Sequence, residues 1–207
     1  MSLTVDDAVE LQIKLAKKVI RHDVISYNKI QYICGVDVSY RNNRAFASAV
    51  VINRESLDEV SSASSIIKIE QPYLPGLLFL RESEPTLSVL KKLEHNYDVL
   101  MVDGHGVLHP RWFGLACYIG MKVNKPVIGV AKNLLCGDIS RGNLAILLNG
   151  RLAGYAVKKG AKPIYVSVGH KISLKTAVKL VKEVSRYRIP EPLRIADVNS
   201  RRMARGY

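Results

Sequence analysis

The sequence predicts a mixed α/β fold in which helices cover both faces of one central sheet. Apolar runs separated by turn residues indicate successive strands in residues 31–70, as in an antiparallel meander. Helical and strand-like segments then alternate over residues 83–131, which is typical of parallel strands joined by helical crossovers. Hydrophobic residues make up 48% of the chain, enough for a substantial core.

The N-terminal part predicts one helix and then the meander. Residues 4–22 read as an amphipathic helix, because Thr4 and Asp7 form a capping box ahead of an apolar stripe. The predicted strands cover residues 31–40, 45–52 and 64–70, with a turn at 41–44. Since side chains alternate along a strand, we expect Asp37 on the face opposite its apolar neighbours.

The remaining segments complete the sheet. The alternating part predicts helices at 83–95 and 111–122 and strands at 98–102 and 126–131. A hairpin of strands 144–149 and 152–157 should turn at Asn149-Gly150, a strong type I′ signal. A strand at 164–168, a helix capped by Ser173 and a basic helix from Pro190 to near Arg205 follow.

This order of elements is that of a ribonuclease H-like fold. Active-site groups gather at strand ends in such a sheet, so Asp37 and Asp103 are expected to be neighbours. The length of 207 residues fits one catalytic domain spanning residues 1–207, and we find no repeat or linker.

The charge balance favours a polyanionic partner. Lys and Arg number 31 against 18 Asp and Glu, which gives a formal net charge of +13. Such an excess favours nucleic acid, although a solvated basic surface without a partner is the alternative. The chain lacks the P-loop, G-x-G-x-x-G, H-E-x-x-H and G-x-S-x-G motifs, so NTPase, dinucleotide-dependent, zinc-protease and serine-hydrolase functions have no support.

Cysteine usage and hydropathy bear on the compartment. The three cysteines, Cys34, Cys117 and Cys136, include no C-x-x-C pair, and we expect the first two to be buried. A reduced, cytoplasmic protein fits best. No apolar run approaches the ~20 residues that span a bilayer, and the N-terminus lacks a signal-peptide core. No unpaired apolar face is evident, so a monomer is expected.

Three carboxylates stand in distinctive settings. Asp103 ends the apolar run 99–102 and precedes Gly-His-Gly, Asp37 lies in Gly-Val-Asp-Val-Ser-Tyr, and Glu82 closes a segment rich in proline and glycine. A lone Asp after a strand is usually a turn or cap residue. Together, however, these oxygens suit Mg²⁺, and two divalent ions ~3.5–4 Å apart can drive phosphodiester hydrolysis.

Further residues are candidates for contacts with nucleic acid. Lys132 follows a predicted strand and could neutralise a phosphate, or it could be an ordinary exposed lysine. His109, favoured over His170, could bind phosphate or shuttle a proton. Pro72-Tyr73-Leu74-Pro75 could be a rigid apolar wedge that unstacks a base step, or simply a tight loop whose Tyr73 packs on the surface.

Taken together, these segments resemble the endonuclease V family over essentially the whole chain. The resemblance rests on the order and spacing of short motifs. They are Gly35-Val36-Asp37-Val38-Ser39-Tyr40, Pro72-Tyr73-Leu74-Pro75-Gly76, Phe79-Leu80-Arg81-Glu82, Val102-Asp103-Gly104-His105-Gly106, His109-Pro110-Arg111, Gly114-Leu115-Ala116, Gly129-Val130-Ala131-Lys132, Gly169-His170 and 190–197.

The resemblance implies a ribonuclease H-like nuclease that depends on Mg²⁺, with Mn²⁺ as a possible substitute. It implies recognition of deoxyinosine, whose base is hypoxanthine, and hydrolysis of the second phosphodiester bond 3′ to the lesion, leaving 3′-hydroxyl and 5′-phosphate ends. Asp37 and Asp103 would be the principal metal ligands. Glu82 would hold the metal or its water, and Asp197 would be a further ligand.

The resemblance also implies how the substrate is held. Lys132 and His109 would serve the scissile phosphate and its departing oxygen. The wedge would be Pro72, Tyr73, Leu74 and Pro75. Because a lesion base must leave the stack to be inspected, a pocket around Gly76, Leu78 and Gly104 would read it.

Two other functions remain open. Relatives within the family can prefer RNA, so an inosine-specific endoribonuclease is the first alternative, since contacts to the 2′-hydroxyl are not legible in a sequence. The second is a non-catalytic nucleic-acid-binding module on the same fold. The intact Asp37, Glu82 and Asp103 argue against it, because a binding module has no need of three acidic groups facing a polyanion.

Overall fold

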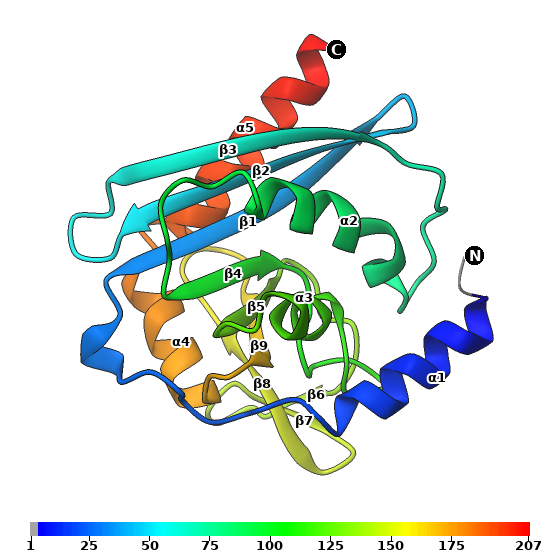
Figure 1. Cartoon of the computed structure of the whole chain (residues 1–207). Helices are drawn as coiled ribbons and strands as arrows, with labels where there is room; N and C mark the ends of the chain where they lie inside the picture. Colours follow the sequence, from blue (N-terminus) through cyan, green and yellow to red (C-terminus); the bar gives the residue numbers. More distant parts are fainter. Residues whose placement is uncertain (1–3) are drawn as a thin grey trace.

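The computed structural model describes residues 4–207, within which nine strands form one mixed sheet (Figure 1). The strands lie in the order β3-β2-β1-β4-β5-β9-β8-β7-β6. They are β1 Tyr32–Arg41, β2 Arg44–Asn53, β3 Glu59–Lys68, β4 Val99–Asp103, β5 Val127–Ala131, β6 Asp138–Ile139, β7 Ala145–Leu148, β8 Arg151–Val157 and β9 Ile164–His170. The helices are α1 Val5–Ala16, α2 Leu78–Leu90, α3 Leu115–Val123, α4 Leu174–Glu183 and α5 Glu191–Gly206, with a 3-10 helix η1 at Tyr27–Lys29.

The pairing of the strands confirms the predicted ribonuclease H-like mixed sheet. Strands β1, β2 and β3 form the antiparallel meander. Strand β4 pairs parallel with β1 and with β5, as the alternation of helices and strands predicted. Strand β9 then runs antiparallel to β5 and leads the sheet to its outer hairpin.

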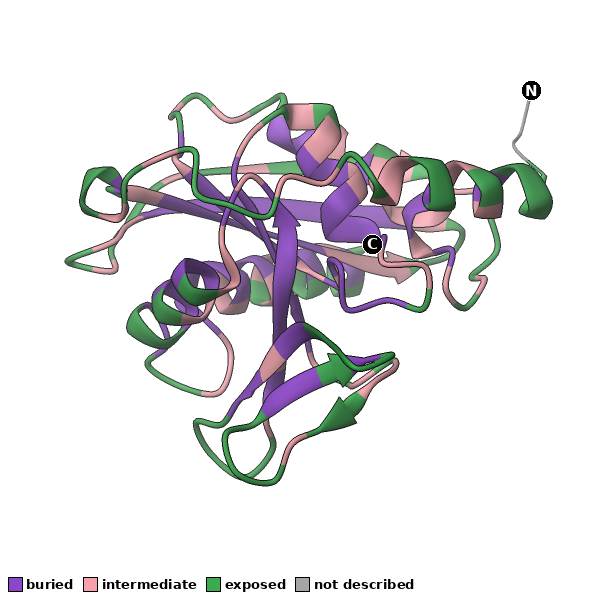
Figure 2. Ribbon diagram, turned by 90° about the horizontal axis from the view of Figure 1, so that it is seen from below, coloured by how far each residue is buried: buried purple, intermediate pink, exposed green. Residues whose placement is uncertain are grey.

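Helices cover both faces of the sheet, as predicted. On one face, α2 and α3 pack with β1, β2 and β4 around Phe79, Leu100 and Ile119. On the other face, α4 and α5 pack around Ile33, Met101 and Leu180. The central strands are therefore buried on both sides, whereas β6 and the turn between β7 and β8 are exposed (Figure 2).

Two hairpins use residues with positive φ. Asn149 and Gly150 have φ of 51° and 73° between β7 and β8, so the predicted type I′ turn is confirmed. Asn42 and Asn43, with φ of 48° and 56°, join β1 to β2 in the same way. This second turn extends the β1–β2 hairpin beyond the body of the sheet (Figure 1).

Several predicted boundaries of helices and strands were wrong by four or five residues. The helix expected at 83–95 begins five residues earlier, directly after the loop that ends at Gly76, and it accommodates Pro85 in its interior. The helix expected at 111–122 begins only at Leu115, because Trp112 has a positive φ of 57° and the preceding residues form turns. Strand β3 starts at Glu59, five residues before the expected start at 64.

The first helix is shorter than predicted. Its capping box forms as expected, but it ends at Ala16, not near residue 22. Beyond it, the chain is drawn into contact with the end of β9. The Ile20 N–H donates to His170 Nδ1, and Ile20 O accepts from the Lys171 N–H. These tertiary hydrogen bonds replace further helical turns, and they give His170 a structural contact.

The surface features bear on three further expectations. Cys34 and Cys117 are buried, as predicted, and all three thiols are free. Leu144, Leu147 and Leu152 near the outer hairpin are 42%, 38% and 47% exposed, and the expectation of a monomer without an unpaired apolar face stays a prediction. No helix within residues 4–207 is long and apolar enough to cross a membrane.

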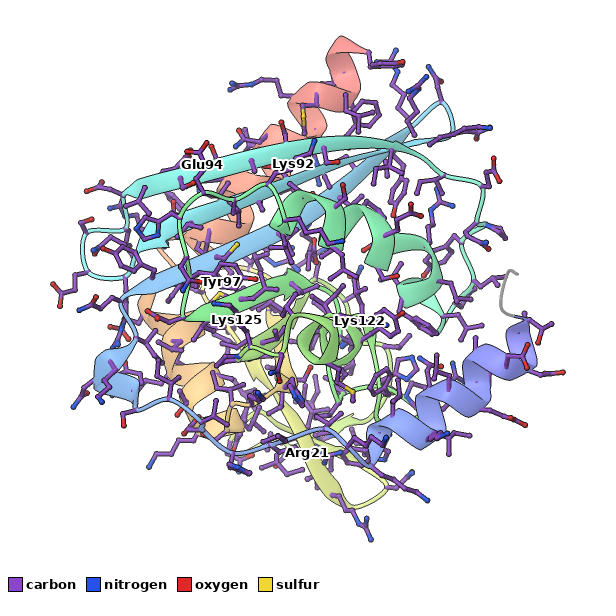
Figure 3. All side chains as sticks on the ribbon, in the orientation of Figure 1. Arg21, Lys92, Glu94, Tyr97, Lys122 and Lys125 are labelled. Atoms are coloured by element: carbon purple, nitrogen blue, oxygen red, sulfur yellow. The ribbon has the colours of Figure 1, made fainter. Side chains whose placement is uncertain are left out.

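The end of the sheet opposite Asp103 is closed by polar contacts. Lys125, just before β5, and Tyr97, before β4, lie together (Figure 3). The Lys125 ammonium donates to the Tyr97 carbonyl oxygen at 2.8 Å and lies 4.6 Å from the centre of the Tyr97 ring. The contact joins the segments that lead into two parallel strands.

Candidate active site

Three carboxylates from three different elements meet at one end of the central strands. Asp37 lies on β1, Asp103 ends β4 and Asp197 lies on α5, and one carboxylate oxygen from each lies within 4.8 Å of the other two. Since Val36 pairs with Val102 in the parallel ladder, Asp37 and Asp103 follow at the same level on adjacent strands. The expectation that these two residues are neighbours is confirmed.

The close approach of α5 to β1 brings the third carboxylate to the site. A Cβ at Gly35 would lie 2.3 Å from the backbone carbon of Pro192, so only glycine allows this contact. With α5 packed so closely, Asp197 lies beside the strand ends. The buried Ser200, one turn further along the helix, donates to Asp37 Oδ2 at 2.6 Å.

Lys132 supplies the positive charge nearest to the carboxylates. It directly follows β5, and its Nζ lies 2.6 Å from Asp103 Oδ2, 3.0 Å from Asp197 Oδ1 and 4.0 Å from Asp37 Oδ1. Burial disfavours its charged form, but the adjacent carboxylates outweigh burial and raise the pKa of Lys132. The alternative of an ordinary exposed lysine is therefore wrong.

Lys132 does not neutralise all the negative charge of the carboxylates. Arg201 lies 3.0 Å from Asp197 Oδ1, but its side chain is largely exposed. Burial, and then the charge of Asp103, raise the pKa of Asp37 to about 7. A carboxyl group held at this level exchanges protons readily near neutral pH, and a cation at the site would favour its ionised form.

Glu82 lies beside this group on α2. It does not belong to the set of three whose oxygens approach within 4.8 Å. Burial, followed by the charges of Asp103 and Asp37, nevertheless raises its pKa to about 8. The adjacent Tyr40 hydroxyl is buried, and it has no hydrogen-bond partner within residues 4–207. The charge of Glu82 adds to burial in raising the Tyr40 pKa.

A pocket of about 180 Å³ lies on the other side of the Asp103 segment. It is lined by Gln12, Tyr73, Gly76, Leu78, Phe79, His105, His109, Gly114, Leu115, Asn133, Leu134 and Leu135. Its walls combine apolar side chains with a few polar groups, which is typical of a site for a small organic group. Because Asp103 and His105 are two residues apart, the carboxylates and this pocket are neighbours along one loop.

The carbonyl oxygen of Gly76 is the centre of a polar network at the pocket wall. It accepts hydrogen bonds from Gln12 Nε2 at 3.1 Å, His109 Nε2 at 3.0 Å and Arg111 Nη2 at 2.7 Å. Gly76 has a φ of +76°, which favours glycine. The network fixes the end of the loop that carries residues 72–75.

Gln12 ties α1 into this network, although it stands on a surface helix. It is 1% exposed, its Nε2 also donates to Phe113 O at 2.7 Å, and its Oε1 accepts from Arg111 Nε at 2.6 Å. Sequence reasoning missed Gln12 and Arg111. The available signal was a glutamine within the apolar stripe of the first helix, where a polar side chain needs a buried partner.

The histidines of the pocket are neutral. Burial, and then the charge of Arg111, lower the pKa of His109 to about 4. Its Nδ1 accepts from the Arg111 N–H, so Nε2 carries the proton that goes to Gly76 O. Burial also lowers the pKa of His105, whose Nε2 lies 3.0 Å from the carbonyl oxygen of Asn133. The structure thus places His109 in the pocket wall, apart from the three carboxylates.

The predicted lesion-pocket residues divide into two groups. Gly76 and Leu78 line the pocket. Gly104 lies behind it, because a Cβ there would contact Leu115 at 3.3 Å and its N–H already donates to Val130 O. In the predicted wedge, Tyr73 lines the pocket and is 62% exposed, so it is not packed away as in a tight loop.

The fold and this site define a class of protein. A ribonuclease H-like sheet that gathers carboxylates at the ends of its central strands, beside a lysine, has the ligands a nuclease needs to hold divalent cations. The donor set fits hard cations, since its atoms are all carboxylate oxygens. The chain is a nuclease of this fold class.

Comparisons with known proteins identify the family. The sequence profile of Endonuclease V matches residues 13–198. Endonuclease V of Thermofilum pendens is 40% identical, over 99% of this chain and 91% of the relative. Human ENDOV is 34% identical with a TM-score of 0.89, over 98% of this chain and 99% of its own. The chain belongs to the Endonuclease V family and is an endonuclease.

A further solved relative carries nucleic acid. Ciona intestinalis Endonuclease V was crystallised with a 24mer DNA containing an inosine followed by a ribo-adenosine. It is 32% identical to this chain, with a TM-score of 0.89 over 98% of both chains. The predicted resemblance to the endonuclease V family is thus confirmed by sequence and by structure.

Proposed function

We propose that this endonuclease recognises deoxyinosine in DNA and hydrolyses the second phosphodiester bond 3′ to the lesion, leaving 3′-hydroxyl and 5′-phosphate ends. The observation that carries the proposal is the convergence of Asp37, Asp103 and Asp197 around Lys132. The relative bound to inosine-containing DNA supports the choice of lesion.

The carboxylates are suited to hold Mg²⁺, with Mn²⁺ as a substitute. Asp37, Asp103 and Asp197 would be the ligands, and the adjacent Glu82 would complete the acidic site. When bound, such cations activate the attacking water and stabilise the leaving oxygen of a phosphodiester. Three carboxylates face the Lys132 ammonium and the exposed guanidinium of Arg201 in the described site, so they still outnumber the cations and added positive charge is electrostatically favoured there.

Lys132 and His109 are the proposed contacts to the scissile phosphate. With cations on the carboxylates, the Lys132 ammonium is free to turn to a non-bridging phosphate oxygen, where its charge stabilises the transition state. His109 would act through Nε2–H. Since that proton now goes to Gly76 O, its action on the phosphate requires this hydrogen bond to open.

The pocket and the loop before α2 are proposed to read the base. Pro72, Tyr73, Leu74 and Pro75 would separate the strands, because two prolines stiffen the loop and Tyr73 is exposed beside the pocket. The extruded hypoxanthine would enter between Leu78, Phe79 and Leu115. Gly76 and Leu78 would offer backbone groups to its edge, and Gly104 would support that wall from behind Leu115.

One assay tests this function. A duplex with a single deoxyinosine is incubated with the purified protein and Mg²⁺ or Mn²⁺, and the products are sized against synthetic markers for each bond near the lesion. We expect one nick at the second bond 3′ to deoxyinosine and none in the undamaged duplex. Absence of cutting with either cation contradicts the proposal.

Inosine-containing RNA is the second candidate substrate. The Ciona relative was bound to an oligonucleotide whose inosine is followed by a ribo-adenosine, so a relative's site accepts a ribonucleotide there. Matched DNA and RNA oligonucleotides, compared under single-turnover conditions, decide the preference. A rate on RNA above that on DNA would make the endoribonuclease the main function.

A further inference from the structure

A second hollow lies beyond the carboxylates, beside the β1–β2 hairpin. We call it the hairpin groove, and its volume is about 530 Å³. It is lined by Tyr40, Arg41, Asn42, Asn43, Arg44, Lys68, Ile69, Glu70, Gln71, Pro72 and Arg81. These residues come from the hairpin, from the end of β3 with the loop after it, and from α2, which approach one another at this edge of the molecule (Figure 1).

The hairpin groove carries a strong excess of positive charge. Four cationic side chains line it, Arg41, Arg44, Lys68 and Arg81, against the single carboxylate of Glu70. Glu70 lies 3.0 Å from Lys68, and both are highly exposed, so this pair is weak. The three arginines have no carboxylate within salt-bridge distance among residues 4–207.

The guanidinium groups are nevertheless held in place by neutral partners. Arg41 Nη1 donates to the carbonyl oxygens of Ala204 and Arg205 at 3.0 and 2.9 Å. Arg44 lies 4.8 Å from the ring centre of Tyr207, and Arg81 lies 4.2 Å from that of Tyr40. Rings and carbonyls orient the guanidinium groups without cancelling their charge, so N–H groups remain for an anion.

The groove continues from the two functional regions already described. Tyr40 lies three residues beyond Asp37 on β1, Arg81 precedes Glu82 on α2, and Pro72 belongs to the proposed wedge. A chain of phosphates whose scissile bond lies at the carboxylates, and whose base step is opened by the wedge, therefore reaches these cations next.

We propose that the hairpin groove binds consecutive phosphates of the substrate strand, on one flank of the lesion. This inference rests on the proposed function, and it adds a surface that supplies affinity without reading sequence. Contacts of this kind position a nucleic acid, whereas the pocket supplies the discrimination. Arg44 and Lys68 are the residues to test, since both are accessible and neither contacts the carboxylates.

The test measures equilibrium binding without divalent cations, using fluorescence anisotropy between about 50 and 200 mM salt, the range in which phosphate contacts are most visible. The variant Arg44→Gln/Lys68→Gln is compared with Lys175→Gln/Lys182→Gln on α4, which removes the same charge at a distant exposed site (Figure 1). The groove variant should bind about tenfold more weakly and lose about 1.5 to 2 from the salt slope, equally on inosine and undamaged oligonucleotides. The control variant should match the unmodified protein.

Two further measurements keep the outcome decisive. Arg44→Lys should retain the salt slope, which separates loss of charge from loss of the ring contact, and thermal unfolding should be unchanged in all variants. Shortening the oligonucleotide from one end should remove the penalty of the groove variant, which identifies the flank. Equal salt slopes for groove and control variants, or a penalty that survives shortening at both ends, overturns the proposal. Because undamaged oligonucleotides report on the groove, its failure is distinguishable from failure of deoxyinosine cleavage.

Discussion

The carboxylate group and the pocket lined by His105 lie on either side of residues 103–105, yet they are built in different ways. The carboxylates stand on regular elements, β1, β4 and α5, and ladder pairing alone sets two of them side by side. The pocket is formed largely by loops, and its wall is fixed by buried hydrogen bonds to Gly76 O. The first region holds charge on a rigid frame, whereas the second depends on a polar network that a single substitution can open.

The two regions also differ in the state of their ionisable groups. Burial and mutual repulsion raise the pKa of Asp37 and of Glu82, so the carboxylate region favours bound cations. Burial lowers the pKa of His105 and His109, so the pocket is neutral at physiological pH. A neutral pocket suits an uncharged base, and an acidic site suits cations that meet phosphate. The comparison predicts that substitutions among the carboxylates should lower the cleavage rate. Substitutions at the pocket should instead lower the preference for inosine over undamaged DNA.

The largest effect is expected from Asp103→Asn. It keeps the shape of the side chain but removes the charge that faces Lys132 and would bind the cation, so single-turnover cleavage should fall by at least about 10²-fold. Binding of inosine DNA should be kept or strengthened, because negative charge near phosphate is lost. Cleavage at the unmodified rate would show that the carboxylates do not form the active site.

The next largest effect is expected from Gln12→Leu. It leaves Phe113 O and Arg111 Nε without their partner and withdraws one donor from Gly76 O, which should cost about 2 kcal/mol of folding stability. The preference for inosine over undamaged DNA, measured as a ratio of single-turnover rates, should fall about tenfold as the loop loosens. Such a fall would show that Gln12 supports the recognition of inosine.

The matched control is Lys14→Ala on the exposed face of the same helix. It should change neither stability nor preference. If Gln12→Leu lowers stability but leaves the rate ratio intact, the network is structural only and does not position the pocket.

Sequence reasoning predicted the carboxylate region far better than the pocket. Strand periodicity and alternating elements are local signals, and they sufficed to place Asp37 and Asp103 together. Asp197 came only from resemblance, since nothing local in α5 indicates that Gly35 admits the helix so closely. The excess of Lys and Arg was also visible in the sequence, but the sequence did not show that four of these residues from three segments line one groove.

The pocket was less predictable because its determinants are tertiary. Gln12 and Gly76 are separated by 64 residues, and no spacing rule links them. The same cause explains the misplaced end of the first helix, where hydrogen bonds between Ile20 and the end of β9 replaced helical turns. Gly106, which follows His105, also has a tertiary reason, because a Cβ there would lie 2.0 Å from the carbonyl oxygen of Val168.

A smaller effect is expected from Tyr73→Ala in the wedge. Tyr73 is 62% exposed, so its loss should leave thermal unfolding nearly unchanged. Stacking of a base on an aromatic ring is worth about 1–3 kcal/mol, so binding to inosine duplex should weaken about tenfold. Tyr73→Phe should restore it, because the ring is kept. An unchanged preference for inosine in the alanine variant would remove the wedge from the mechanism of recognition.

The smallest effect is a pH dependence that separates the two regions in the metal-free protein. Asp37 and Glu82 have pKa values raised to about 7 and about 8, so between roughly pH 4 and 8 the folded chain holds protons that the unfolded chain has released. The free energy of unfolding should therefore decrease as the pH rises across this range.

Opposing behaviour is expected from the pocket. The pKa of His109 is lowered to about 4 in the folded chain, so between about pH 4 and 7 the unfolded chain holds a proton on this ring that the folded chain has released. The contribution of His109 to the free energy of unfolding therefore rises with pH across this range. Urea unfolding of Asp37→Asn and His109→Gln across this range separates the two contributions. Asp37→Asn should remove much of the decrease, and His109→Gln should remove the rise.

Saturating Mg²⁺ should also abolish the decrease in the unmodified protein, because a cation on the carboxylates replaces the protons. A decrease that persists in Mg²⁺ would mean that the carboxylates do not bind the cation, and the division between an acidic cutting region and a neutral reading region would fail.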